Sequence, residues 1–488
     1  MTPEGVTIKH PDKLFIGGEW VAATSGAEIE LVNPFSEEVV GRVAHASNAD
    51  MDKAVDAARE AFDNGPWPRL SPKERMAKLM QFCDELEKRV PELATAWTAQ
   101  IGGLATAAGP MHGGAVAGLR GIAALGESFE WTSQRKGQAV DTVVMVREPV
   151  GVVAAIAPWN GPFAIMANKV FYSLIAGCTV IMKPSPETPL EAYIIAECAE
   201  ACGMPAGTVN LVPSDREAAD HLVHSTKLDK ITFTGSSAAG KHIASVAGSN
   251  MTRATFELGG KSAAIIRDDF PTEAAAQILG NTITVMSGQV CAMLSRAIVP
   301  KARHDELAEA IAGVMKGVKI GDPNDPETQL GPVAMKRQLD RIEMYIEEGR
   351  KSADLVTGGN RPSHMNKGYF IEPTLFANVD NSSRIAQEEI FGPVLCLIPA
   401  EDEEDMIRIA NDSEYGLNGS VFTNDAQAAY DIARQVRTGV VGQNGMRMEW
   451  TAPFGGFKSS GIGREGGEEG LWGYLETKTI LTDASVTI

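Results

Sequence analysis

Short runs of hydrophobic residues alternate with longer stretches of helical periodicity from residue 149 onward. The short runs are typical of buried strands, and the stretches between them are long enough for helices that cross over a sheet. This alternation predicts a parallel sheet with helices on both faces. Thr188 is expected to cap the second helix, with Pro189 at its first position. Strands are expected at 152–156, 179–182, 209–212 and 230–234, and helices at 163–176, 189–202, 216–224 and 238–247.

Further elements lie on either side of this region. Amphipathic helices are expected at 50–62 and 71–90, and a second alternating series between residues 272 and 437 predicts another α/β domain. The segment 140–148 alternates like one strand of a hairpin, and 477–488 is also strand-like. Because these two strands lie outside both domains, they are well placed to pair across subunits.

Composition and charge narrow the class of protein. The chain has 488 residues, 44% hydrophobic and 22% charged, which is typical of a soluble globular protein of two or three domains. Its 63 acidic and 44 basic residues give a formal net charge of -19, which argues against nucleic-acid and anionic-membrane partners. Residues 1–13 are polar, and the longest apolar run, 149–159, is too short to cross a bilayer. We therefore expect a cytoplasmic location.

The cysteines lack the spacing of a disulfide framework and are expected to be free thiols in a reducing compartment. Cys198 and Cys202 lie four residues apart on one expected helix, and His221 and His224 lie three apart on the next. Zinc requires three or four converging ligands, and neither pair has a further ligand nearby in the sequence. We interpret them as packed thiols and surface histidines and expect no metal. The six cysteines are Cys83, Cys178, Cys198, Cys202, Cys291 and Cys396.

A lone thiol stands beside a small-residue turn at 288–291, Gly-Gln-Val-Cys. A cysteine thiolate attacks carbonyl carbon, so Cys291 is a candidate nucleophile. Glu257 lies in an apolar run followed by glycines, where burial would raise the pKa of its carboxyl and let it activate water. Together they supply a nucleophile and a base for carbonyl chemistry.

Two segments are candidates for nucleotide binding, although no Gly-x-Gly-x-x-Gly fingerprint follows an expected strand. Residues 235–242, Gly-Ser-Ser-Ala-Ala-Gly-Lys-His, nearly match a phosphate-binding loop, but His242 stands where that loop needs Ser or Thr to hold magnesium. This segment is either a helix N-terminus that receives one phosphate or a plain strand-to-helix turn. Lys183 and Ser185 either hold the hydroxyls of an adenosine ribose or belong to a proline-stiffened loop.

A series of motifs resembles the aldehyde dehydrogenase superfamily over essentially the whole chain. It runs from Phe-Ile-Gly-Gly-Glu-Trp at 15–20 to Pro-Phe-Gly-Gly-Phe-Lys-Ser-Ser-Gly at 453–461. Each motif alone is modest, but their joint order is highly specific. Between the two ends lie Pro158-Trp159-Asn160, Lys183-Pro184-Ser185, Phe233-Thr234-Gly235-Ser236, Glu257-Leu258-Gly259-Gly260-Lys261, Gly288-Gln289-Val290-Cys291 and Glu389-Ile390-Phe391-Gly392-Pro393.

The resemblance implies oxidation of an aldehyde to its carboxylate with a nicotinamide coenzyme, through a thiohemiacetal and then a thioester. Cys291 matches the nucleophile, and Asn160 matches the side-chain donor of an oxyanion hole that also uses the backbone N–H of Cys291. Glu257 matches the base that activates water. Lys169 and Glu465 match a pair that passes the proton outward, and a buried salt bridge between domains is an equal alternative.

The resemblance also implies a coenzyme site. Many relatives that prefer NAD have a glutamate at the place of Pro186, where it repels a 2′-phosphate, and here Glu187 comes one residue later. We therefore expect NAD as the coenzyme, with measurable use of NADP. The expected nucleotide cradle is Trp159, Lys183, Ser185, Gly207, Gly235 and Ser236, and the expected contacts of the nicotinamide ribose and ring are Gln338, Glu389 and Phe391.

The implied fold is α/β, with a doubly wound parallel-sheet cofactor domain, a second α/β catalytic domain that carries Cys291, and a β-strand oligomerisation arm. The cofactor domain is expected at 1–125 and 149–256, and the catalytic domain at 257–470. The arm is expected at 126–148 and 471–488. This architecture implies a homo-oligomer, either a dimer or a dimer of dimers.

The expected substrate is a bulky apolar aldehyde, aromatic or terpenoid. Small residues widen a substrate tunnel, and methionines adapt to apolar groups. Arg447 offers an alternative, since an inward guanidinium would select a semialdehyde that carries a carboxylate. The expected tunnel residues are Gly161, Ala164 and Asn168 on one wall and Met446, Met448 and Trp450 on the other.

Three other interpretations compete with hydrolytic aldehyde oxidation. Phosphotransfer at 235–241 is disfavoured by His242. Acyl transfer to coenzyme A fits less well, because members of that branch generally lack the base held here by Glu257. A non-catalytic binding relative is disfavoured by the joint presence of Cys291, Glu257 and Asn160.

Overall fold

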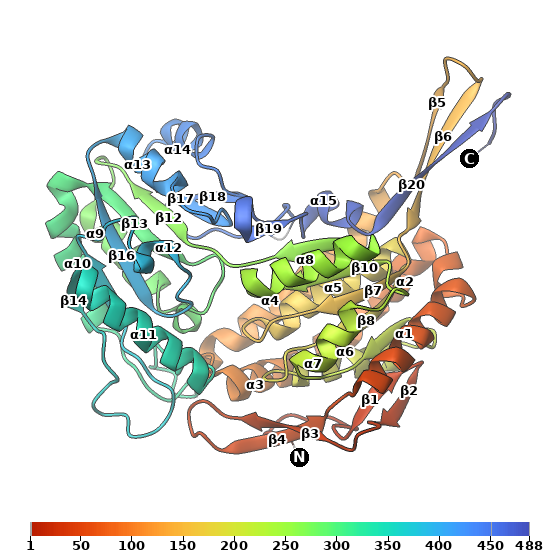
Figure 1. The fold of residues 1–488 in the computed structure, drawn as a ribbon, viewed down its shortest axis with the longest axis horizontal. Coiled ribbons are helices and arrows are strands. Elements are labelled where there is room, and N and C mark those ends of the chain that lie inside the picture. Colours follow the sequence, from red (N-terminus) through yellow and green to blue (C-terminus); the bar gives the residue numbers. More distant parts are fainter. Residues whose placement is uncertain (1, 450, 488) are drawn as a thin grey trace.

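The computed structural model describes residues 2–449 and 451–487 and shows two α/β lobes, with a narrow β-arm projecting from the first (Figure 1). The first lobe contains an eight-stranded sheet with the order β19-β11-β10-β7-β8-β9-β1-β2. Its five central strands are parallel, and β19 and the β1–β2 hairpin add antiparallel edges. The strands are β1 Lys13–Ile16, β2 Glu19–Ala22, β7 Val152–Ile156, β8 Thr179–Lys183, β9 Val209–Leu211, β10 Lys230–Thr234, β11 Arg253–Glu257 and β19 Gly461–Ile462.

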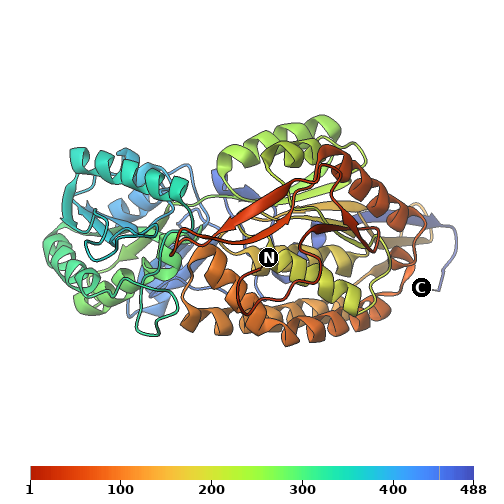
Figure 2. The same cartoon turned by 90° about the horizontal axis from the view of Figure 1, so that it is seen from below.

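Helices cover both faces of this sheet, as the sequence predicts (Figure 2). Val153 and Ala155 of β7 pack in the core formed with α2 to α6, whereas Val152 and Ala154 face the core formed with α1, α7 and α8. Since successive side chains of a strand point to opposite faces, burial on both sides makes the whole strand apolar. The helices are α1 Asn48–Asp63, α2 Pro72–Lys88, α3 Val90–Ile101, α4 Ala105–Ser128, α5 Pro162–Ala176, α6 Leu190–Ala201, α7 Arg216–Val223 and α8 Ser237–Asn250.

The second lobe contains a seven-stranded sheet with the order β14-β15-β16-β13-β12-β17-β18, in which β14 alone runs antiparallel to its neighbour. Helices α9 and α10 pack in the core on one face, and α11 to α14 pack on the other. The α/β fold class is therefore confirmed. The elements are β12 Ser262–Ile266, β13 Leu294–Pro300, β14 Asp354–Thr357, β15 Thr374–Ala377, β16 Val394–Ala400, β17 Asn418–Phe422, β18 Val440–Gln443, α9 Thr272–Thr282, α10 His304–Lys316, α11 Lys336–Ser352, α12 Arg384–Gln387, α13 Glu403–Asn411 and α14 Ala426–Ala433.

The arm is a three-stranded antiparallel sheet with the order β20-β6-β5, comprising β5 Thr132–Lys136, β6 Thr142–Pro149 and β20 Leu475–Thr482. The hairpin expected around 140–148 is present. The two strands expected to lie at a subunit contact pair with each other within the chain, from Leu475 opposite Pro149 to Thr482 opposite Thr142, and their pairing across subunits stays a prediction. The sequence alone could not show this pairing, because the two strands are far apart along the chain.

Several short elements complete the fold. A separate hairpin comprises β3 Glu28–Val32 and β4 Val39–Ala44, and helix α15, Gly467–Trp472, leads into the arm. The division of the chain into the ranges given above stays a prediction, and β19 extends the sheet of the first lobe. The 3-10 turns are Trp67–Arg69, Val285–Gly288, Lys301–Arg303 and Lys458–Ser460.

The start of α6 differs from the prediction. The helix begins at Leu190 with Pro189 at the capping position, and no side chain of that position caps it. The N–H of Leu190 donates to the Gln100 side chain at 3.1 Å, while the Thr188 hydroxyl is buried without a protein partner among the described residues. Thr188 is therefore not the cap, because an amide from α3 satisfies the helix terminus instead.

Membrane, metal and disulfide features can be checked over the described residues. Within these ranges no helix is both long and apolar enough to span a bilayer. No group of three or more His, Cys, Asp or Glu side chains among them is arranged to hold a metal ion. His221 pairs with Asp52 at 2.8 Å on the surface, and Cys198 is buried. All six cysteines are free thiols.

A buried arginine joins the segments of the second lobe. Arg296 of β13 is 2% exposed, and burial lowers its pKa to about 10. Its guanidinium donates to the carbonyls of Lys261, Ile409 and Ala410, each at 3.0 Å. It also donates to the side chain of Asn381 at 2.8 Å. The charge is thus buried with four acceptors, a condition under which a buried cation is tolerated.

We expect Arg296→Met to lower the free energy of unfolding by about 3 kcal/mol or more, because four buried acceptors lose a charged donor. Arg408→Met is the matched control, since that arginine is exposed and pairs with Asp405 on the surface, where an ion pair contributes less than about 1 kcal/mol. Urea denaturation followed by circular dichroism measures both variants. Equal losses would show that the Arg296 contacts contribute no more than a surface pair.

Candidate active site

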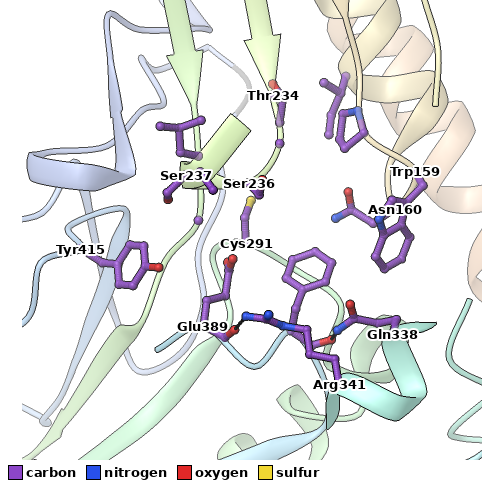
Figure 3. Close-up of a pocket in the computed structure, with 17 residues that line it drawn as sticks. Trp159, Asn160, Thr234, Ser236, Ser237, Cys291, Gln338, Arg341, Glu389 and Tyr415 are labelled. Carbon is purple, nitrogen blue, oxygen red and sulfur yellow. Dashed lines mark hydrogen bonds between the residues drawn. The ribbon is translucent and has the colours of Figure 1, made fainter. Parts of the chain in front are cut away.

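Two connected cavities lie at the carboxyl ends of the parallel strands of the first lobe, where the second lobe meets it. One has a volume of about 440 Å³ and includes Cys291 and Asn160 among its lining residues (Figure 3). The other, of about 740 Å³, extends along the first lobe past Lys183. They share Trp159 and the turn that opens α8, so one elongated ligand can occupy both.

Cys291 follows a turn with an unusual backbone. Met286 and Ser287 have φ values of 51° and 54°, and Gly288 follows with 73°. The Ser287 hydroxyl donates to the carbonyls of Gly331 at 2.8 Å and Pro332 at 3.1 Å. A Cβ atom on Gly288 would lie 2.1 Å from the carbonyl carbon of Gly392, so no other residue fits there. Tertiary contacts therefore hold a strained turn that presents the thiol to the cavity.

The surroundings of Cys291 disfavour a thiolate. Burial, together with the carboxylates of Glu389 and Glu257, raises the pKa of the thiol to about 12. The backbone N–H groups of Cys291 and Ala292 act in the opposite direction. The thiol is therefore protonated at neutral pH, so a base must take its proton when it attacks.

Asn160 lies beside this turn. Asn160 lies in the loop after β7, and its side-chain amide donates to the carbonyl of Gln289 at 2.9 Å. The indole N–H of Trp97 donates to the backbone carbonyl of Asn160 at 3.3 Å. An amide nitrogen has two hydrogens, so one remains for a ligand in the cavity. Asn160 is thus held from both sides and can donate to an oxygen bound near Cys291 (Figure 3).

Glu257 ends β11 and is 3% exposed. Neither carboxyl oxygen has a hydrogen-bond partner among the described residues. Burial raises the pKa of this carboxyl well above its ordinary value, and the negative charge of Glu465 adds to the shift, whereas Lys169 and Arg464 oppose it. Glu257 does not line the 440 Å³ cavity and lies near Gly455. The apolar run thus produces the raised pKa that the sequence predicts.

Lys169 and Glu465 form a buried ion pair next to Glu257. Lys169 lies on α5 and is fully buried, and its ammonium also donates to the Thr232 hydroxyl at 3.1 Å. The Thr232 hydroxyl in turn donates to the carboxylate of Glu465 at 3.3 Å. The structure therefore brings the three predicted groups together, and the pair is also the buried salt bridge of the alternative interpretation.

The expected nucleotide residues lie on the 740 Å³ cavity, with one exception. Lys183 and Ser185 follow β8, and burial lowers the pKa of the Lys183 ammonium to about 8. Gly235 and Ser236 open α8, where the Ser236 hydroxyl accepts from the N–H of Ala239 at 3.3 Å. Gly207 does not line either cavity. With φ of 75°, it packs against α1, where a Cβ atom would lie 2.7 Å from the carbonyl oxygen of Ala57.

The residues expected near the nicotinamide hold one another in place. The Gln338 amide of α11 donates to the carbonyls of Ile390 at 3.0 Å and Phe391 at 2.8 Å. The Phe391 ring meets Trp159 edge-to-face, with centroids 5.3 Å apart. The Glu389 carboxylate accepts from the N–H of Gly260 at 2.9 Å, and burial raises its pKa to about 7.

Some lining residues were not identified from the sequence. Arg341 lies three residues after Gln338 on α11 and donates to the backbone carbonyl of Glu389 at 2.7 Å. Helical spacing could have identified it, because residues three apart share a face. Tyr415 lies in a loop without periodicity and gave no local signal.

The residues expected to line a substrate tunnel differ in how exposed they are. A Cβ atom on Gly161 would lie 3.2 Å from the end of Ile165, while Asn168 is buried and Ala164 half-buried. Arg447 is exposed and donates to the carbonyl of Gln443 at 3.2 Å. The prediction for Trp450 falls outside the described residues. On the opposite wall, Met446 packs against the second-lobe core, and Met448 is 56% exposed.

Comparisons with known proteins agree over nearly the whole chain. The model of the "Aldehyde dehydrogenase family" matches residues 20–480. The chain is 43% identical to geranial dehydrogenase of Castellaniella defragrans, covering 97% of this chain and 99% of that protein. It is 38% identical to a 3-succinoylsemialdehyde-pyridine dehydrogenase of Pseudomonas sp., covering 96% and 98%.

Solved structures give the same result. An aldehyde dehydrogenase of Mycobacterium tuberculosis complexed with NAD⁺ has a TM-score of 0.96 and 42% identity, covering 99% of this chain and 100% of that one. A cysteine-to-alanine mutant of aldehyde dehydrogenase C from Pseudomonas syringae, complexed with NAD⁺ and octanal, has a TM-score of 0.95 and 36% identity. That likeness covers 99% of this chain and 100% of that one.

We expect iodoacetamide to alkylate Cys291 slowly at neutral pH in the coenzyme-free protein, because its pKa of about 12 leaves little thiolate. The rate should rise about tenfold per pH unit between pH 7 and pH 9. Mass spectrometry of the peptide that contains Cys291 measures it, with Cys291→Ala as the control for labelling elsewhere. A rate that stays level over this range would show a thiolate already formed at neutral pH.

Proposed function

Because the chain belongs to the aldehyde dehydrogenase family, we propose that it oxidises an aldehyde to its carboxylic acid with NAD, through a thioester on Cys291. The observation that carries this proposal is the cavity shared by Cys291 and Asn160, which continues into the cavity lined by Lys183 and the N-terminus of α8. A nucleophile and an oxygen-binding donor thus face one end of a site long enough for a dinucleotide.

The first step joins the Cys291 sulfur to the aldehyde carbon. Since the thiol is protonated at neutral pH, its proton leaves to water in the cavity as the bond forms. The carbonyl oxygen becomes negative and is stabilised by the Asn160 amide and the backbone N–H of Cys291. Asn160 needs little reorganisation, because Gln289 and Trp97 already fix it.

Bound NAD supplies the acceptor for the hydride that leaves the carbon of the thiohemiacetal. The chain then holds a thioester, with the carbonyl oxygen still directed at the same donors. Glu257 takes a proton from water, the resulting hydroxide attacks the thioester carbon, and the acid leaves as the Cys291 thiol is restored. The Lys169–Glu465 pair lies next to Glu257 and is proposed to pass the proton onward.

Features of the larger cavity support its assignment to NAD. The Lys183 ammonium and Ser185 hydroxyl are donors suited to the hydroxyls of an adenosine ribose. Gly235 and Ser236 line the cavity at the N-terminus of α8, where the helix dipole favours a phosphate. Glu389 and Phe391 line the smaller cavity beside Cys291, where the nicotinamide is proposed to lie.

The proposed substrate is a bulky apolar aldehyde, aromatic or terpenoid. Support comes from the 43% identity to a geranial dehydrogenase and from the outward orientation of Arg447, which bonds to the Gln443 carbonyl. A carboxylate-bearing semialdehyde remains the second candidate, since the chain is also 38% identical to a semialdehyde dehydrogenase. Cys291 and Asn160 share one cavity, and Glu257 lies close enough to raise the pKa of Cys291, which speaks against a non-catalytic relative.

We also propose that the protein is a cytoplasmic homo-oligomer, a dimer or a dimer of dimers. The arm supports this, because β5 and β20 each pair only with β6 among the described residues and leave two strand edges open. Ile480 and Leu481 of β20 are 41% and 60% exposed, and Trp472 beside the arm is 40% exposed. Such apolar exposure favours a contact with a second copy. The six free thiols support a reducing compartment.

We expect Glu257→Gln to separate the two halves of the reaction. Hydride transfer still occurs once per site, but water is not activated, so stopped-flow absorbance should show a burst of reduced coenzyme followed by turnover at least about a hundredfold slower. Cys291→Ala is the control and should give no burst while still binding NAD. Normal steady turnover of Glu257→Gln would remove this residue from the role of base.

We expect the specificity constant kcat/KM to rise with apolar size. Each buried methylene contributes about 0.8 kcal/mol, or roughly fourfold, so citral and benzaldehyde should exceed acetaldehyde clearly. Initial rates with these three aldehydes and succinic semialdehyde provide the measurement. If succinic semialdehyde leads the series, the apolar tunnel is wrong and Arg447 selects the substrate.

A further inference from the structure

An ion pair connects the two lobes across the larger cavity. Arg337, the second residue of α11, contacts Glu187 in the loop after β8, with the guanidinium 2.5 Å from the carboxylate. Both side chains line the 740 Å³ cavity. The Glu187 side chain is 21% exposed, whereas that of Arg337 is 67% exposed and lies mostly in solvent. The carboxylate is therefore held in place, and the guanidinium is able to move.

The other oxygen of Glu187 accepts from the Ser185 hydroxyl. Glu187 is thus shared between a group proposed to bind the adenosine ribose and an arginine from the opposite lobe. A carboxylate at this position would repel a 2′-phosphate, but Arg337 neutralises it. Pro186 leaves no second carboxylate in the loop between Ser185 and Glu187.

Among the described residues, no other cation pairs with Glu187. Asp215 accepts from the first turn of α7, and His242 is bound to Asp220 at 2.6 Å. Arg216 also lines the cavity, and Lys183 is buried at the base of the loop. Arg337 is the cation in direct contact with the carboxylate next to the proposed ribose site.

We propose that Arg337 selects between the coenzymes, by moving its guanidinium from Glu187 to a 2′-phosphate when NADP binds. With NAD, Arg337 stays paired and keeps the Glu187 carboxylate against Ser185. A guanidinium binds phosphate with two parallel hydrogen bonds, so the exchange replaces one charge-assisted contact by another. This inference rests on the proposed function, in which Lys183 and Ser185 hold the adenosine ribose.

The test is the ratio of the dissociation constants of NADP and NAD, measured by isothermal titration calorimetry on the full-length protein without substrate. Arg337→Gln should weaken NADP binding about tenfold, which corresponds to about 1.4 kcal/mol, and change NAD binding much less. Glu187→Gln should change the ratio in the opposite direction, toward NADP. Titration with 2′,5′-ADP and 5′-AMP should reproduce both changes, because these fragments carry only the adenosine end.

Lys336→Gln is the matched control. Lys336 is the neighbouring residue on α11, it carries the same charge, and it pairs with Asp340 at 2.6 Å outside the cavity. Loss of that charge should leave the ratio unchanged, since it alters the overall field but not the contact with Glu187.

Three outcomes would overturn the proposal: equal weakening of both coenzymes by Arg337→Gln, an equal change in the ratio by Lys336→Gln, or binding of NAD but not of millimolar NADP by the unmodified protein. Failure of the unmodified protein to bind either coenzyme or 5′-AMP would instead overturn the proposed function together with this inference. Selection by Arg337 and the existence of the coenzyme site are thus tested separately.

Discussion

The left-handed turn at Met286, Ser287 and Gly288 determines where the nucleophile lies. Positive φ values cost a Met or Ser residue about 1–3 kcal/mol each, so such a turn persists only where neighbouring groups hold it. Here the carbonyl of Gly331 accepts from Ser287, and the backbone at Gly392 packs against Gly288. Gly331 lies shortly before α11, which carries Gln338. Gly392 directly follows the segment that contains Glu389 and Phe391. The nucleophile and the proposed nicotinamide contacts are therefore positioned by one network of backbone contacts.

Burial shifts the acidic groups of the site in one direction. The pKa of Cys291 is raised to about 12 and that of Glu389 to about 7, and the carboxyl of Glu257 is raised as well. Each of these groups gains a proton more readily than it would in water. Lys169 and Glu465 form a buried ion pair next to these groups. Charge thus develops in this site mainly during the reaction, when the Asn160 amide is already in place to stabilise it.

Much of this arrangement could be predicted from the sequence because it depends on local patterns. Alternating apolar runs identify both sheets, and the order of short motifs identifies Cys291, Asn160 and Glu257 as candidates. The failures have a different cause, since they depend on contacts between distant segments. Gln100 takes the place of Thr188 at the start of α6, and the pairing of β20 with β6 within the chain was not predicted. Gly207 matches a family motif, but in this structure it permits close packing against α1. The role of Arg337 depends on a carboxylate in the opposite lobe, which periodicity does not reveal.

The C-terminal end of the chain contributes to structures that begin much earlier. The strand β19 completes the edge of the first sheet, Glu465 neutralises the buried Lys169 of α5, and β20 pairs with β6. During synthesis on the ribosome, nearly the whole second lobe emerges before these three contacts with the first lobe can form. Until then the edge strand β11 lacks β19, the Lys169 ammonium lacks Glu465, and β6 lacks β20. Contacts of such sequence separation form slowly. Although the amino-terminal lobe is made first, it is completed last, and its unfinished edge is the part of the nascent chain most in need of protection by a chaperone.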